Sequence, residues 1–283
     1  MYERDWQRKA CREAGEEAMA LVQNVRRQMP RIGTRKLYYL LHQQFEERQL
    51  KVGRDKLFTL LRNKGLLVAR RRRYTRTTDS RHWMRKYENR VKDVTLERPE
   101  QVFVSDITYI STERGYNYLS LVTDACSKKI MGHALRKDLS PKGCLQALEI
   151  ALKNRTTDAP LIHHSDRGLQ YCSKDYIELL RTHEVGISMT ENGDPYENAI
   201  AERVNGILKE EFYLSETFAS HDEAARHIEQ SIQIYNTRRP HLTCNMMTPE
   251  LAHQAKTLNL KSWERPSKKK GPQLGPVSPQ ALT

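Results

Sequence analysis

An aspartate interrupts the most strand-like segment of the chain, and this combination restricts the fold more than any other feature of the sequence. Residues 102–110 are mostly β-branched, aromatic or otherwise apolar, with Asp106 at their centre. Aspartate is depleted in β-strands, and a buried ionised carboxylate is costly unless something stabilises its charge. The segment therefore predicts a central strand whose carboxylate is stabilised either by a bound cation or by an ion pair with a nearby arginine.

Two further carboxylates complete a set that suits a hard divalent cation. Asp166 ends a predicted strand at 161–165, the kind of strand end where ligands collect in open α/β sheets. Glu202 lies on a predicted helix, opposite its apolar stripe, with 35 residues between it and Asp166. Taken singly, Asp166 also fits an ordinary turn and Glu202 a solvent-facing position. Together with Asp106 they can hold two cations that activate a water or hydroxyl for attack on a phosphodiester.

The positive charge is concentrated in the first third of the chain. The sequence has 48 Lys and Arg against 35 Asp and Glu, a net charge of +13. Residues 1–98 contain 26 basic and 12 acidic residues, whereas the remainder is almost neutral. So local an excess favours binding to a phosphate backbone over a merely solubilising surface.

The composition argues against a membrane, secreted or zinc protein. No window reaches the ~18 apolar residues that span a bilayer, and the charged N-terminus lacks an apolar signal core. The 5 cysteines are odd in number and form no C-x-x-C pair, so neither disulfides nor a zinc site is predicted. We therefore expect an intracellular protein without a membrane partner.

The sequence divides into four parts. Residues 1–64 predict a small all-α helix-turn-helix domain that binds DNA, although the same spacing fits a plain three-helix bundle. Residues 65–98 read as a basic linker. Residues 99–255 give consecutive strands and then alternating helices and strands, which predicts an α/β domain with a mixed sheet. Residues 256–283, rich in lysine and proline, predict a disordered tail.

The basic residues of the first two parts are the candidate DNA contacts. Those on the helices are expected to project outward, and those in the linker form a continuous run. The candidates are Arg35, Lys36, Arg54, Lys56, Arg62, Lys64, Arg70, Arg71, Arg72 and Arg73. The linker also carries Tyr74, Trp83 and Tyr87, which suit either stacking on a nucleic acid or anchoring of the linker to the next domain.

The sequence motifs around the three carboxylates resemble those of a known family. SDITYI around Asp106, HSDRGLQY around Asp166 and DPYENAIAERVNGILKEE around Glu202 are similar to the motifs of bacterial insertion-sequence transposases with a retroviral-integrase-type D-D-E core. The resemblance is to the type encoded in a frameshifted second reading frame. GTRKLYYLL resembles the helix-turn-helix segment that precedes this core, and YNTRRPH at 235–241 resembles its C-terminal helix. The similarity covers nearly all of residues 30–255.

The resemblance implies a ribonuclease-H-like fold and a metal-dependent DNA transposase, which is a polynucleotidyl transferase. Asp106, Asp166 and Glu202 would hold two Mg²⁺ ions, with Mn²⁺ as a substitute. The enzyme would cleave at element ends to free a 3′-hydroxyl and join that hydroxyl to another DNA strand. Arg167, with His164 beside the site, would contact DNA or else simply orient Asp166.

The same resemblance implies the partners. They are double-stranded DNA of the element ends and of the target, a second copy of the chain or a larger assembly on DNA, and an upstream-frame partner or fusion segment. The expected location is the bacterial cytoplasm, on the nucleoid when DNA is bound.

Two departures and two rival functions remain. Phe103 and Ser105 stand where the family often has Trp and Thr, and the run after His241 lacks the usual Leu-Gly pair. The rivals are a non-catalytic DNA-binding regulator of transposase descent and a metal-dependent nuclease without joining activity. The intact carboxylate set argues against the regulator, and the basic N-terminal module argues against the simple nuclease.

Overall fold

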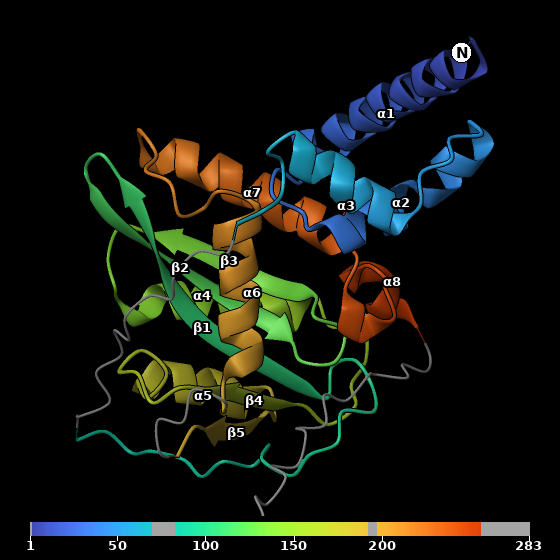
Figure 1. Ribbon diagram of the computed structural model, residues 1–283. Coiled ribbons are helices and arrows are strands. Elements are labelled where there is room, and N and C mark those ends of the chain that lie inside the picture. Colours follow the sequence, from blue (N-terminus) through green and yellow to red (C-terminus); the bar gives the residue numbers. More distant parts are fainter. Residues whose placement is uncertain (1, 70–82, 192–196, 256–283) are drawn as a thin grey trace, which may run out of the picture.

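A five-stranded mixed sheet with helices on both faces forms the centre of the molecule (Figure 1). The structure is a computed structural model that describes residues 2–69, 83–191 and 197–255. Its strands are β1 (Val102–Thr112), β2 (Gly115–Asp124), β3 (Ile130–Arg136), β4 (Ile162–Ser165) and β5 (Gly186–Met189). The first three form an antiparallel meander, and β4 and β5 join in parallel to β1, in the order β3-β2-β1-β4-β5. The predicted α/β class with a ribonuclease-H-like core is confirmed, with β1 at its centre.

The helices divide between an N-terminal group and the two faces of the sheet. They are α1 (Tyr2–Gln28), α2 (Thr34–Glu47), α3 (Arg54–Asn63), α4 (Pro141–Lys153), α5 (Lys174–Thr182), α6 (Ala199–Glu211), α7 (His221–Arg238) and α8 (Pro249–Gln254). The short helix α8 was not predicted, although it has a clear start signal: the Thr248 side chain caps it by accepting from the Leu251 N–H. No helix among the described residues is both long and apolar enough to cross a bilayer.

Alternation along the central strands creates two apolar layers. On one face, Phe103 and Val122 pack in a cluster with residues of α4 and α5. On the other face, Ile110 and Leu121 pack in a cluster with residues of α6 and α7. Gly132 in β3 allows α4 to approach closely, since a Cβ there would lie 2.1 Å from a backbone oxygen of the helix. The two layers bury β1 and place α6 beside it.

The N-terminal helices α1–α3 form a small all-α unit beside α7 (Figure 1). Leu37 and Leu61 belong to a buried cluster that continues into Phe212 and Tyr235 at the ends of α6 and α7. The backbone N–H of Arg31 donates to the Glu211 carbonyl oxygen at 3.2 Å. The predicted all-α unit before the core is confirmed, and its apolar core is continuous with one layer of the α/β unit.

Part of the basic linker lies along the outer edge of β5. The Met189 N–H donates to the Glu88 carbonyl oxygen at 3.2 Å, and the Arg90 N–H donates to Ser188 Oγ at 2.8 Å. We call residues 83–91 the strap. Residues 70–82, which include the arginine run Arg70–Arg73, and the predicted tail at 256–283 lie outside the described residues.

The aromatic residues of the linker have different settings. Tyr87 is partly buried against the cluster beneath α4 and α5, so it anchors the strap to the core. Trp83 is 90% exposed at the start of the strap. The two roles that the sequence left open are therefore divided: Tyr87 anchors the linker, and Trp83 is available to a partner.

Candidate active site

The sheet places two of the three predicted carboxylates on neighbouring strands at the same level. Val104 of β1 pairs with His164 of β4 in parallel register. Asp106 and Asp166 each lie two residues beyond that pair, and neighbouring strands are ~4.8 Å apart. Their backbones are therefore adjacent at the end of the sheet where β4 stops. This is the strand end at which ligands bind in open α/β sheets.

Helix α6 brings the third carboxylate to the same place. The Asn198 side chain, just before α6, donates to the Ser105 carbonyl oxygen at 3.0 Å and so attaches the start of the helix to β1. Glu202 lies in the first turn of α6 and is exposed. One turn later, the Asn205 amide donates to Asp106 Oδ2 at 2.8 Å. The face of α6 that carries Glu202 thus lies against Asp106.

The electrostatic setting of Asp106 is unusual for an aspartate. Its pKa is raised to about 7, first by burial and then by the negative charges of Asp166 and Glu202, whereas hydrogen bonds from Asn205 and from the Ile107 N–H oppose the rise. Neither hydrogen-bond donor is charged, so the arginine ion pair that the sequence left open is not formed among the described residues. The negative charges of Asp166 and Glu202 therefore act on Asp106, whose hydrogen bonds come only from neutral donors.

The donor set fits a hard divalent cation. Such ions take carboxylate oxygens, and a cation bound at Asp106 would relieve the repulsion that raises its pKa. Within the described residues, no three His, Cys, Asp or Glu side chains stand close enough to enclose an ion. Like charges that repel one another are expected to stay apart until a cation or a substrate draws them together.

Two buried histidines of β4, His163 and His164, form hydrogen bonds next to the site. His163 Nε2 lies 2.7 Å from Ser105 Oγ and 2.9 Å from the Tyr176 hydroxyl, and burial lowers the pKa of His163 to about 3. His164 is fully buried. Its two ring nitrogens lie 2.9 Å from Ser188 Oγ and 3.0 Å from the Glu197 carbonyl oxygen. The suggested DNA contact by His164 is therefore wrong, because its ring is occupied in holding β4, β5 and the approach to α6 together.

The predicted DNA-contacting residues of the helices are mostly exposed. Arg35, Arg54, Arg62 and Lys64 are exposed, and Lys56 is half-buried with its ammonium on the Lys51 carbonyl oxygen at 3.1 Å. Arg167, beside Asp166, is half-buried.

Lys36 differs from the other basic residues of α2 and α3. The expectation that it projects outward is wrong, because its ammonium lies 3.2 Å from Glu211 at the end of α6 and its side chain is 12% exposed. No local pattern pointed to this partner, since Glu211 is 175 residues away along the chain.

The structure identifies two residues that the sequence interpretation missed. Asn205 donates directly to Asp106. Lys209 lies one turn further along α6: burial lowers its pKa, and the charge of Asp106 opposes that shift. Both follow Glu202 at helical spacing, by three and by seven residues, and so share its face of the helix. Extending the helical stripe from Glu202 would have found them.

The chain matches the family described as "Integrase core domain" over residues 97–195, and a second family of the same description over residues 183–249. It is 33% identical over 219 residues to the insertion element IS600 uncharacterized 31 kDa protein of Shigella sonnei, covering 77% of this chain and 79% of that protein. It is 32% identical over 192 residues to transposase InsF for insertion sequence IS3A of Escherichia coli, covering 67% of each chain.

The similarity to solved structures is at lower sequence identity. One is the HTLV-2 integrase catalytic core domain in complex with magnesium, with 18% identity, a TM-score of 0.45, and coverage of 55% of this chain and 97% of that one. Given the identity and coverage of its sequence relatives, the chain belongs to the family of bacterial insertion-sequence transposases with an integrase core domain.

Proposed function

We propose that this transposase cuts DNA at element ends and joins the freed ends to target DNA at a site formed by Asp106, Asp166 and Glu202. The observation that carries the proposal is the electrostatic setting of Asp106, whose pKa is raised to about 7 by burial and then by the charges of the other two carboxylates. A protein that kept Asp106 only for stability would be expected to pair it with a cation of its own. Asp106 forms no ion pair with a cation of the chain among the described residues, which suits an external divalent cation.

Two Mg²⁺ ions, with Mn²⁺ as a substitute, are the proposed cofactor, and the three carboxylates are their proposed ligands. When bound, such a pair stabilises the attacking and leaving oxygens of an in-line displacement. The residues of the chain supply the positions. Asn205 holds the Asp106 carboxylate in one orientation through its hydrogen bond of 2.8 Å. Lys209, on the same helical face, is placed to contact a phosphate that approaches Asp106.

The DNA-binding part of the proposal assigns the exposed basic residues of α2 and α3 to the element ends. The exposed ones are Arg35, Arg54, Arg62 and Lys64, the last just after α3, and the half-buried Lys56 is assigned with them. The linker arginines Arg70–Arg73 and Arg167 beside the carboxylates join them in the proposal. The proposed boundaries are 1–64 for the DNA-binding unit, 65–98 for the linker and 99–255 for the catalytic unit. Because two ends must be joined, the active form is proposed to contain at least two copies of the chain on DNA.

Substitution of the carboxylates tests the reaction. The full chain is mixed with Mg²⁺ and a duplex that carries the element end, and nicked and joined products are measured. Asp106→Asn, Asp166→Asn and Glu202→Gln should each abolish both products and leave duplex binding intact. The matched control is Glu210→Gln, an exposed carboxylate on the same helix, which should behave as the wild type. Retained cleavage in all three variants would overturn the proposal, and cleavage without joining would indicate a nuclease.

Metal binding has its own readout, independent of activity. A cation that binds only the folded protein stabilises it by an amount that rises with the logarithm of the cation concentration, about 2.7 kcal/mol at 100 times Kd. Mg²⁺ should therefore raise the melting temperature of the wild type and have no such effect on Asp106→Asn. Equal stabilisation of both proteins would place the ion elsewhere.

A further inference from the structure

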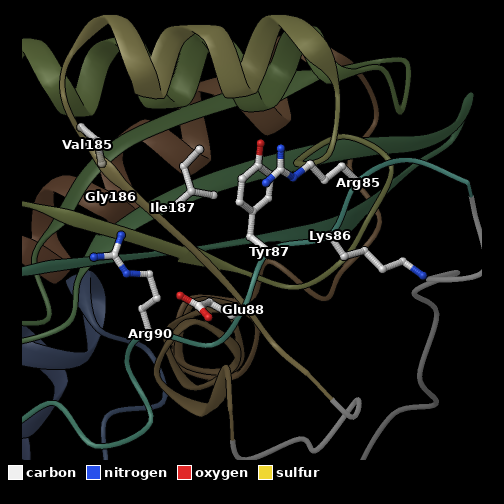
Figure 2. Close-up of a pocket in the computed structure, with 8 residues that line it drawn as sticks. All are labelled: Arg85, Lys86, Tyr87, Glu88, Arg90, Val185, Gly186 and Ile187. Atoms are coloured by element: carbon white, nitrogen blue, oxygen red, sulfur yellow. The ribbon is translucent and has the colours of Figure 1, made fainter.

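An open groove lies between the strap and β5, and none of the three proposed carboxylates lines it (Figure 2). Its volume is about 510 Å³. The strap supplies most of its lining and β5, with the residue before it, supplies the rest. The lining residues are Arg85, Lys86, Tyr87, Glu88, Arg90, Val185, Gly186 and Ile187.

The strap is held in place by its backbone, which leaves its charged side chains available. The N–H groups of Asn89 and Arg90 donate to Glu191 Oε1 at 3.1 Å and to Ser188 Oγ at 2.8 Å. Tyr87 is fixed from two sides: its hydroxyl accepts from Arg181 Nη2 at 3.3 Å, and the Arg85 guanidinium lies 5.2 Å from its ring centre. The groove is therefore a fixed surface in the part of the chain that the structure describes.

The charge of the groove is predominantly positive. Arg85, Lys86 and Arg90 line it and are all exposed, against one exposed carboxylate, that of Glu88. The Arg90 guanidinium lies close to Gly186 of β5: a Cβ added to this glycine would be only 3.2 Å from Arg90 Nη1. Figure 2 shows Lys86 extending away from the other side chains. Three cations spaced along an open channel fit an extended polyanion better than a small enclosed ligand.

The groove is close to the carboxylates. Met189, whose N–H donates to the Glu88 carbonyl oxygen, pairs in register with Ser165, the residue before Asp166. The strap thus lies two strand spacings, about 10 Å, from the end of β4. A second observation agrees: burial raises the pKa of the Cys172 thiol, the charge of Asp166 raises it further, and Lys86 and Arg167 lower it. The charges of Lys86 and Asp166 therefore both influence the Cys172 thiol.

We propose that the strap groove binds the phosphate backbone of the DNA duplex whose scissile bond lies at the carboxylates. This inference rests on the proposed function and adds to it a contact surface that begins about 10 Å from the site.

The salt dependence of DNA binding tests the groove. Affinity of the full chain for a random-sequence duplex and for an element-end duplex is measured by anisotropy over a range of salt, without divalent metal. The slope of log K against log salt is negative, and each phosphate that the protein no longer neutralises should make it shallower by about 0.9. The triple variant R85A/K86A/R90A should therefore make the slope shallower by about 2 to 3. The matched control, R114A/K153A/R226A, removes three exposed charges elsewhere and should keep the wild-type slope. Glu88→Gln should tighten binding.

The outcomes separate this inference from the proposed function. If R85A/K86A/R90A had the same salt slope and affinity as the control variant, the proposal that the groove binds DNA would be contradicted. A normal slope together with loss of self-association would also overturn it and assign the surface to a second copy of the chain. If Asp106→Asn still cleaved DNA while the triple variant showed the shallower slope, the proposal that the groove binds DNA would be supported and the catalytic role of Asp106 would be contradicted. Matching melting curves of the two triple variants establish that neither has simply unfolded.

Discussion

The two ends of α6 carry carboxylates in opposite electrostatic settings. Glu202 in the first turn adds its negative charge to Asp106, whose pKa is raised to about 7, by burial first and by the two other carboxylates next. At the last turn, burial would raise the pKa of Glu211, but the hydrogen bonds and charges of Arg239 and Lys36 lower it. Arg239 donates from Nε and Nη2 to the two Glu211 oxygens, each at 2.7 Å.

The difference separates a structural carboxylate, Glu211, from the proposed catalytic one, Asp106. Glu211 is neutralised by cations of the chain itself, one of them, Lys36, from the N-terminal unit, so it holds α2, α6 and the end of α7 together. Asp106 receives only neutral hydrogen bonds. The same helix thus stabilises the fold at one end, and at the other it gives Asp106 a neutral hydrogen bond and no ion pair, as the proposed cation site requires.

Removing charge at the functional end should have the largest effect on the reaction. Asp106→Asn is expected to lower the rate of strand joining at least about 1,000-fold, which corresponds to ~4 kcal/mol of barrier. The reason is the loss of a proposed metal ligand in a set of three. The rate is measured by product formation on an element-end duplex, with exposed Asp222→Asn as the control. Comparable rates in both variants would mean that Asp106 is as dispensable as a surface aspartate.

Removing charge at the structural end should instead lower the stability of the protein. Arg239→Met leaves Glu211 buried with Lys36 alone, and breaking a buried pair in this way costs about 3–5 kcal/mol. Chemical denaturation measures the loss, and the adjacent exposed Arg238→Met is the control. An effect no larger than that of the control would show that the Arg239–Glu211 contact does little to hold the helices together.

The Asn205 amide is expected to matter for the reaction more than for stability. Asn205→Ala removes the donor that orients Asp106, and removal of such an outer partner typically costs about 10–100-fold in metal affinity or activity. The concentration of Mg²⁺ needed for half-maximal joining should rise accordingly, with Gln230→Ala on the exposed side of α7 as the control. An unchanged Mg²⁺ requirement would show that Asn205 is only a packing residue.

The raised pKa of Asp106 also predicts that this carboxylate makes the stability of the folded protein depend on pH. Its folded pKa of about 7 lies above the ordinary value of 3.8. The carboxylate therefore favours folding when protonated, and this stability is lost as the pH rises through about 7. Without divalent metal, Asp106→Asn should be more stable than the wild type above about pH 7 by about 1–3 kcal/mol, and the advantage should vanish near about pH 4. A pH-independent difference in melting temperature would contradict this.

The smallest effect is expected at Lys36. Its pKa is lowered to about 8, first by burial and then by the charge of Arg239, while Glu211 opposes the shift. Because Arg239 already binds both Glu211 oxygens, Lys36→Met should change the free energy of unfolding by less than about 1 kcal/mol. The control is Arg35→Met at the exposed neighbouring position. A loss of stability as large as that of Arg239→Met would mean that both cations are needed to neutralise Glu211.

The sequence predicted the order of elements and the strand that carries Asp106 because these depend on local pattern. The β-branched, aromatic and other apolar residues of 102–110 predicted β1, and the positions of the three carboxylates in a strand, at a strand end and on a helix made them the candidates. What it did not predict depends on contacts between distant segments. Lys36 reads as one more exposed lysine on a basic helix until Glu211 is placed beside it. In the same way, nothing local in Tyr87 distinguishes an anchor from a stacking residue, because its packing partners follow it by many residues.

Crystallography with Mn²⁺ tests the central claim most directly. The full chain is crystallised with an element-end duplex and Mn²⁺, and anomalous scattering locates the ions. We predict two peaks about 3.5–4 Å apart, with oxygens of Asp106, Asp166 and Glu202 as ligands at ~2.1 Å. Ordered DNA with no anomalous peak at these carboxylates, or with peaks held by other residues, would contradict the account.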